Sequence, residues 1–243
     1  MDWWWGVTYS TEQRHATTPP NTIGDGAAML MWTDPPYGLN KVMAGTAAKY
    51  TDTGTTELVL DTLNAWVPKM GDNATIVVCL DYRLVHHVAA RFEWVLRGEI
   101  IWGFGLGAPR QSWWPVRHNT LLTFTRTTTS GMFDRAAQPR QTRLAPKKGY
   151  TDDKPAGSIW DFTMSNTHPD RRGYPNQKPV EIITPFINAH TAPGDLVVDP
   201  FMGGGSTGVA ALRSGRRFWG GDISPDAVTN ANTVFASMTG GGA

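Results

Sequence analysis

The stretch DLVVDPFMGGGSTGVAAL, residues 195–212, carries the strongest structural signal in this chain. A short apolar run ends in an acid at Asp199, a glycine-rich turn follows, and small apolar residues then favour a helix. Glycines take positive φ and let a backbone approach a ligand closely. A second strand-like run, 217–221, ends at Asp222, about 20 residues beyond the first glycine, where an acid can bond ribose hydroxyls. The stretch therefore predicts a nucleotide-binding βαβ unit within an α/β fold.

The same turn matches G-x-G-x-x-G over residues 203–208, which makes a dinucleotide site an alternative. In a dinucleotide site the glycines follow the strand directly and leave the helix N-terminus to the pyrophosphate. Here Asp199, Pro200 and Phe201 come first. A carboxylate at this place repels phosphate but suits the ammonium and sulfonium groups of S-adenosylmethionine. The pattern therefore favours the cationic donor.

A second motif, Asp34-Pro35-Pro36-Tyr37, follows the apolar run 27–33, which predicts a strand. The two prolines fix φ and hold the backbone extended. The Asp34 carboxylate can accept a hydrogen bond from an amino group, and the Tyr37 ring offers a surface for stacking a flat base. A strand-ending turn with a helix-capping Asp is the structural alternative. Together with the glycine loop, the motif indicates methyl transfer to an exocyclic amine.

These motifs resemble those of the amino-methylating DNA methyltransferases, the N6-adenine and N4-cytosine group. That family pairs [DNS]-P-P-[YF] with D-P-F-x-G-x-G, and the order found here is similar to that of its permuted beta class. The segment YPNQKPVE, residues 174–181, resembles the H-P-T-Q-K-P-V-E that precedes the donor loop in this class. Residues 99–102 and 117–124 resemble its strand-and-hairpin region.

The resemblance and the alternation of strand-like and helix-like segments predict the same fold. We expect an α/β domain with a Rossmann-like, mainly parallel sheet, helices on both faces, and a small loop-rich target-recognition insertion. The chain is expected to form one methyltransferase domain over residues 1–243. Its parts would be a catalytic half at 1–125, the insertion at about 126–175, and a donor-binding part at 176–243.

The resemblance implies site-specific transfer of a methyl group from S-adenosylmethionine to adenine N6 of a flipped base in double-stranded DNA. Asp34 would accept one N–H of the amine and the Pro35 carbonyl the other, which exposes the nitrogen lone pair. The catalytic residues implied are Asp34, Pro35, Pro36 and Tyr37. The donor-binding residues implied are Asp25, Lys178, Asp199, Phe201, Gly203, Gly205 and Asp222.

Two of these assignments have plain structural alternatives. Only eight residues separate Asp25 from Asp34, a shorter connection than the family usually has. Asp25 is expected at the adenine amino group of the donor, or else is a turn residue. Phe201 is expected either at the donor or in the core. Asp222 stands where the family commonly has Glu, which keeps the carboxylate.

The function also has alternatives at this stage. Family members that act on cytosine N4 more often have Ser in place of Asp34, so adenine is favoured and cytosine remains open. Methylation of RNA or of a protein amide would use the same acceptor pair. A catalytically silent DNA-binding protein is the alternative from another class, and a nicotinamide-dependent oxidoreductase is the least favoured. A donor-binding assay separates the silent protein from the enzyme.

Charge is distributed unevenly, although the net charge is only +1. Residues 126–175 contain nine basic and five acidic side chains, whereas the remainder has 13 basic and 16 acidic ones. A basic, loop-rich segment suits phosphate contacts and groove reading, with a merely solvated loop as the alternative.

Trp113 and Trp114 are expected in the core or at a subunit contact, with base stacking as the alternative.

Composition narrows the remaining choices. No run approaches the roughly 20 apolar residues of a membrane span, and the N-terminus lacks a basic secretory start. The single cysteine, Cys79, is expected in the core of a cytoplasmic protein. The six histidines show no metal-binding spacing, so no metal is expected. The family often dimerises, which makes a homodimer an expectation. The size suits a solitary or phage-encoded enzyme, and the sequence leaves open whether it belongs to a restriction-modification pair.

Further elements are predicted from apolar spacing. We expect a helix over 55–67 with Thr55 or Thr56 as its cap, a strand over 75–80, and a helix within 84–96. A helix over 181–187 contains Pro185, and an amphipathic helix over 226–238 closes the fold.

Overall fold

The structure is a computed structural model that describes residues 8–37, 52–104, 114–142, 153–162 and 174–239. Its main feature is an eight-stranded sheet with the order β1-β10-β9-β2-β3-β5-β4-β8. The strands of this sheet are β1 (Tyr9–Gln13), β2 (Ala28–Thr33), β3 (Met70–Leu80), β4 (Val95–Gly103), β5 (His118–Thr125), β8 (Ile159–Asp161), β9 (Leu196–Asp199) and β10 (Arg217–Asp222). All neighbouring pairs are parallel except β3 with β5 and β5 with β4.

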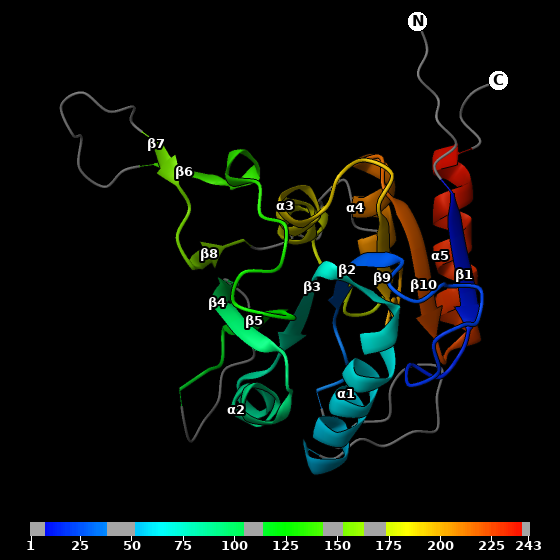
Figure 1. Ribbon diagram of the computed structural model, residues 1–243, viewed down its shortest axis with the longest axis horizontal. Coiled ribbons are helices and arrows are strands. Elements are labelled where there is room, and N and C mark those ends of the chain that lie inside the picture. The colour runs from blue at the N-terminus through cyan, green and yellow to red at the C-terminus, as the bar shows by residue number, and fades with distance from the viewer. Residues whose placement is uncertain (1–7, 38–51, 105–113, 143–152, 163–173, 240–243) are drawn as a thin grey trace, which may run out of the picture.

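Helices cover both faces of this sheet (Figure 1). The helices are α1 (Asp52–Trp66), α2 (Tyr82–Arg91), α3 (Val180–His190), α4 (Ser206–Arg213) and α5 (Pro225–Thr239). One core cluster joins buried residues of α1 and α2 to the sheet, and a second joins those of α3, α4 and α5 to it. The predicted α/β fold with a mainly parallel sheet is therefore confirmed.

The central strands are formed by residues that favour burial on both sides. All of β2 except Met29 is buried, and so are residues 74–80 of β3. Parallel strands covered on both faces read as continuous apolar runs, which is why these two strands were predictable. Cys79 is fully buried in β3, as expected.

Several predicted boundaries differ from the structure. Helix α1 begins at Asp52, so Thr55 and Thr56 are buried inside it and the predicted cap is wrong. Helix α2 ends at Arg91, inside the range in which a helix was expected, but it begins two residues before that range, after Asp81, whose carboxylate accepts the Arg83 N–H at 3.1 Å. Strand β1 was not predicted, because its polar residues pair only with β10 at the sheet edge. Pro185 lies within α3, as predicted.

The segment after β5 contains short regular pieces where little order was expected. These are one 3₁₀ helix, η2 (Arg135–Ala137), and two strands, β6 (Arg140–Thr142) and β7 (Asp153–Pro155). Another 3₁₀ helix, η1 (Val67–Lys69), precedes β3 in sequence. Strands β6 and β7 form a separate two-stranded sheet (Figure 1). Within the described ranges, no helix has the length and apolar character needed to cross a membrane.

Candidate active site

A cavity lies at the carboxyl ends of β2, β9 and β10, where the two predicted motifs meet. Open α/β sheets bind ligands at this edge. The two motifs lie on adjacent strands because β2 pairs with β9 in the middle of the sheet. The lining includes Trp32, Asp34, Pro36, Leu58, Tyr174, Asn176, Gln177, Lys178, Asp199, Phe201, Met202, Gly203, Gly204, Ser206, Thr207, Asp222 and Ile223.

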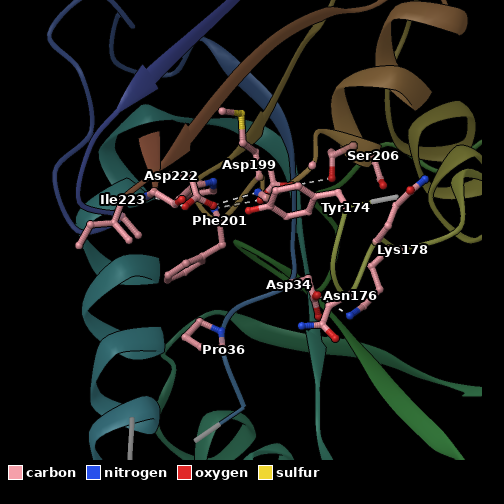
Figure 2. Close-up of a pocket in the computed structure, with 18 of the residues that line it drawn as sticks. Asp34, Pro36, Tyr174, Asn176, Lys178, Asp199, Phe201, Ser206, Asp222 and Ile223 are labelled. Atoms are coloured by element: carbon pink, nitrogen blue, oxygen red, sulfur yellow. Dashed lines mark hydrogen bonds and ion pairs between the residues drawn. The ribbon is translucent and has the colours of Figure 1, made fainter. Parts of the chain in front are cut away.

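Asp34 forms an ion pair with Lys178 in this cavity (Figure 2). The Lys178 Nζ lies 2.5 Å from Asp34 Oδ2, and the two side chains are 12% and 19% exposed. Lys178 lies in the segment just before α3. The ion pair therefore joins the D-P-P-Y motif to the segment that precedes the glycine loop in sequence. Burial disfavours the charged ammonium, but the Asp34 carboxylate outweighs it and raises the Lys178 pKa above its usual value. Lys178 is therefore a cation beside Asp34.

The Tyr37 hydroxyl donates a hydrogen bond to Asp34 Oδ1, on the other side of the carboxylate. The Asn119 amide donates to the same hydroxyl at 3.0 Å, and the Cys79 Sγ lies 3.4 Å from it. Burial, the Asp34 charge and Cys79 raise the Tyr37 pKa well above its usual value, so the hydroxyl stays protonated. The ring is half-buried against the core, with the Lys178 Nζ 5.1 Å from its centroid.

Asp199 links the two motifs directly. Its Oδ1 accepts the Thr33 hydroxyl at 2.8 Å and the Phe201 N–H at 3.1 Å, and its Oδ2 accepts the Thr207 hydroxyl at 2.6 Å. Thr33 immediately precedes Asp34, so these bonds connect the end of β2 with the end of β9 and the start of α4. Burial raises the Asp199 pKa to about 7, although the three hydrogen bonds oppose that shift.

Asp222 ends β10 and faces the same cavity (Figure 2). Its Oδ2 accepts the Gly203 N–H at 2.9 Å, and its Oδ1 accepts the Ser224 N–H at 2.9 Å. Burial outweighs these bonds and raises the pKa of the carboxyl. The backbone therefore orients this carboxylate between the glycine loop and the start of α5.

The glycine loop has the conformation and the space that its sequence predicts. Gly203 and Gly205 have φ of 48° and 80°, which side chains rarely adopt. A Cβ at Gly204 would lie 2.8 Å from the Tyr174 ring. A Cβ at Gly205 would lie 2.8 Å from Phe235 in α5, so this glycine serves helix packing.

Most predicted site residues converge, and four do not line the cavity. Pro35 is buried, Tyr37 contacts Asp34 and packs against the core, and Gly205 faces α5. Asp25 lies in a turn with its side chain 78% exposed, and its carboxylate contacts Lys69 Nζ at 2.9 Å. The structure thus places Asp25 in the turn role that was its alternative.

The described residues of the predicted target-recognition segment divide between the two ends of the strands: Tyr174 lines the cavity and β8 pairs with the end of β4, whereas residues 126–139 lie toward the opposite ends. Thr125 ends β5 beside Thr75 in the middle of β3, whereas Asp34 directly follows Thr33, which lies beside Val78 near the end of β3. The Asp134 N–H then bonds the Ala189 carbonyl near the end of α3 at 2.7 Å. Arg140 pairs with Asp153 at 2.5 Å. Residues 143–152 and 163–173, with their basic side chains, lie outside the described residues.

The connection from β4 to β5 starts and ends at the same ends of the strands as Asp34, which are called the catalytic edge below. The Phe104 N–H bonds the Arg117 carbonyl at 2.9 Å, and Asn119 reaches Tyr37. Trp114 is 80% exposed in this connection, so it does not lie in the core, and the subunit contact that was expected as the other role stays a prediction. Trp113 lies outside the described residues.

Sequence reasoning missed Thr33, Thr207, Asn119 and Tyr174 at this site. Thr33 and Thr207 carried a usable signal, because each adjoins a recognised motif and can donate a hydrogen bond to a buried acid. Asn119 and Tyr174 belong to segments that the resemblance singled out, 117–124 and 174–181, but their approach to the site depends on the sheet pairing and the loop path. No three His, Cys, Asp or Glu side chains come together as a metal site in the part of the chain that is described.

Comparison with known proteins agrees with this arrangement. A family model described as DNA methylase, for N6 and N4 methyltransferases, matches residues 28–233. The chain is 38% identical over 85 residues to the DNA adenine methyltransferase YhdJ of Escherichia coli (strain K12), covering 35% of this chain and 29% of that protein. It is 29% identical over 153 residues to the type II methyltransferase M.BglII of Bacillus subtilis, covering 58% and 42%. The matched part thus spans less than half of each relative.

Solved structures share the fold at low sequence identity. The PvuII DNA methyltransferase (cytosine-N4-specific) superposes with a TM-score of 0.74 at 18% identity, covering 94% of this chain and 86% of that one. The M1.HpyAVI–SAM complex gives 0.63 at 19% identity, covering 93% and 100%. Since the family model spans most of the sequence, the chain belongs to the N6/N4 DNA methylase family, as its motifs predicted.

Proposed function

We propose that this protein transfers a methyl group from S-adenosylmethionine to adenine N6 in double-stranded DNA. One observation carries the proposal: Asp34 of the D-P-P-Y motif faces the same cavity as Asp199 and Asp222 of the donor motifs. An amine acceptor and a nucleotide-binding loop therefore share one site. The Asp in the first position of the motif supports adenine over cytosine.

The residues around the cavity fit the proposed donor. Asp222 is a backbone-held carboxylate suited to ribose hydroxyls, and beside it Ile223 exposes apolar surface, 43% of the residue, that suits a flat base. Asp199 supplies negative charge for a cationic methionine end. When bound, S-adenosylmethionine would supply an electrophilic methyl group.

The chain's own contribution would be to position and desolvate the target amine. Its lone pair is delocalised into the base ring, so the amine is a weak nucleophile. Asp34 accepts one N–H, and the Pro35 carbonyl accepts the other, which directs the lone pair out of the ring plane. Asp34 also stabilises the positive charge that develops on nitrogen. Lys178 and Tyr37 hold the two carboxylate oxygens while leaving lone pairs free, since a carboxylate has about four acceptor sites.

The base must leave the duplex to reach this depth, at a cost of a few kcal/mol. Holding amine and methyl in line then accounts for much of the expected rate.

The test is transfer of labelled methyl from S-adenosylmethionine to duplex DNA, followed by nucleoside mass spectrometry. N6-methyladenine supports the proposal, whereas N4-methylcytosine keeps the mechanism and changes the base. The matched control is Asp34→Asn, which preserves size but weakens the acceptor. This variant should bind the donor and transfer no methyl. If the wild type binds the donor but incorporates no methyl into DNA, RNA or protein acceptors should be tested next. If it neither binds the donor nor incorporates methyl, a catalytically silent DNA-binding protein is favoured.

A further inference from the structure

We propose that Asn119 is a positioning residue for methyl transfer, which directs the Tyr37 hydroxyl onto Asp34 and thereby fixes the catalytic carboxylate. The inference rests on the proposed function and adds a residue that the sequence analysis did not name as a site residue. Asn119 is the second residue of β5, far from the catalytic turn in sequence, and its side chain reaches the site through the sheet.

The geometry forms a continuous chain of hydrogen bonds. Asn119 is 8% exposed and pairs in register with Trp102 of β4. Its Nδ2 lies 3.0 Å from the Tyr37 hydroxyl oxygen, and that hydroxyl donates to Asp34 Oδ1. Strand β5 is held against β3 from Thr120 to Thr125, so the sheet fixes the position of the amide.

The chemistry of these groups sets the direction of the chain. A phenol has one proton to donate, and an amide NH₂ can only donate. The Asn119 amide therefore occupies an acceptor site on the Tyr37 oxygen and leaves the phenol proton for another partner. Cys79 is fully buried, and burial with the nearby Asp34 charge raises its thiol pKa to about 12, so the thiol is protonated. Within the described residues, the Asp34 carboxylate is thus the acceptor for the proton of this hydroxyl.

This arrangement holds the carboxylate from both sides. Lys178 contacts Oδ2 and Tyr37 contacts Oδ1, so the plane of the group is set before a target amine arrives. In Asn119→Asp the new carboxylate would be an acceptor, so the Tyr37 hydroxyl could donate its proton to residue 119 instead of to Asp34. Asp34 would lose one of its two anchors and could rotate away from the amine.

A double-mutant cycle between residues 119 and 37 tests the proposal. The variants are Asn119→Asp, Tyr37→Phe and the double variant, with Asn119→Leu as an isosteric replacement should the buried carboxylate prevent folding. We measure kcat for methyl transfer to duplex DNA and the Kd for S-adenosylmethionine. Each change at residue 119 should lower kcat by about tenfold, as expected for the loss of a hydrogen bond that reaches a charged group, and leave the Kd unchanged.

Tyr37→Phe removes the hydroxyl through which Asn119 acts. In that background, either change at residue 119 should lower kcat no further. An equal further loss would show that Asn119 acts independently of Tyr37 and would overturn the proposal, as would a wild-type kcat in the single variants.

Failure of the proposed function gives a different result. If the wild type transfers no methyl to DNA while binding the donor, the assigned reaction is wrong. The same cycle is then read from the free energy of unfolding in urea. Coupling between residues 119 and 37 supports the hydrogen-bond chain, and purely additive effects overturn it.

Discussion

Lys178 is the largely buried cation that pairs with Asp34. Its ammonium pairs with a carboxylate that must also serve the target amine, and both groups are largely withdrawn from water. Burying two charges is costly, and removing one partner of such a pair is strongly destabilising because the other charge is left uncompensated.

Asp34→Ala should therefore lower the free energy of unfolding by about 3 kcal/mol, because Lys178 remains buried without its partner. The double variant Asp34→Ala/Lys178→Met should recover much of this loss. Urea unfolding of the three proteins measures both effects. Equal stabilities of Asp34→Ala and the wild type would mean that the pair contributes nothing in solution.

Asp199 predicts a pH dependence of donor binding. Its pKa is raised to about 7 by burial, so below pH 7 the carboxyl is increasingly neutral and no longer attracts a cation. Affinity for S-adenosylmethionine should therefore weaken as pH falls below 7, by up to about tenfold per pH unit. Calorimetric titrations between pH 5.5 and 8.5 measure this slope.

Two variants test whether the Asp199 carboxyl causes the slope of donor affinity against pH. Asp199→Asn should bind weakly at every pH and give a nearly flat profile. Asp222→Asn should keep the slope, because it leaves Asp199 in place. A flat wild-type profile would show that Asp199 stays ionised throughout this range.

At the scale of elements, Gly208 determines how closely α4 approaches α5. A Cβ at this position would overlap the Phe235 ring and lie 2.7 Å from Phe218 Cε1. Gly208→Ala should therefore lower the free energy of unfolding by about 1–3 kcal/mol through overpacking, despite the better helix propensity of alanine. Thermal or urea unfolding measures the change. Gly98→Ala is the matched control, since its Cβ would meet nothing within 4 Å and stability should hardly change.

The same scale shows what the sequence could predict. Strands β2 and β9 were predictable because continuous apolar runs end in acids, and the glycine loop because it joins a strand to a helix. The start of α1 was misplaced because the apolar spacing begins one turn after the helix does. Contacts of Asn119 and Lys178 with the catalytic turn depend on pairing between distant segments, which local patterns do not encode.

At the scale of the whole molecule, the two edges of the sheet have different roles. The catalytic turn, the donor loop and the β4–β5 connection share one edge, while residues 126–139 and the β6–β7 sheet lie toward the other. The first part of the basic segment singled out in the sequence, residues 126–139, thus lies away from Asp34, whereas Tyr174 near its end lines the cavity. We expect DNA phosphates to contact the catalytic edge.

Two exposed arginines test this expectation as a matched pair. Arg117 lies beside the end of β4, and Arg135 lies near the end of α3. Arg117→Ala should weaken duplex binding and reduce the slope of log affinity against log salt by about 1, since one phosphate contact is lost. Arg135→Ala should leave both unchanged. Fluorescence anisotropy at several salt concentrations measures them, and the reverse result would place DNA at the opposite edge.

The bond between Thr33 and Asp199 joins residues 166 positions apart, and β2 lies between β3 and β9 in the sheet. On the ribosome, the D-P-P-Y residues are synthesised before β9 and must wait for it to emerge before the neighbouring strand and the Asp199 acceptor of Thr33 exist. A nascent chain that lacks β9 therefore has the D-P-P-Y residues but no assembled site. Activity should appear only after β9 has been synthesised, so chains terminated before Asp199 would be inert toward DNA.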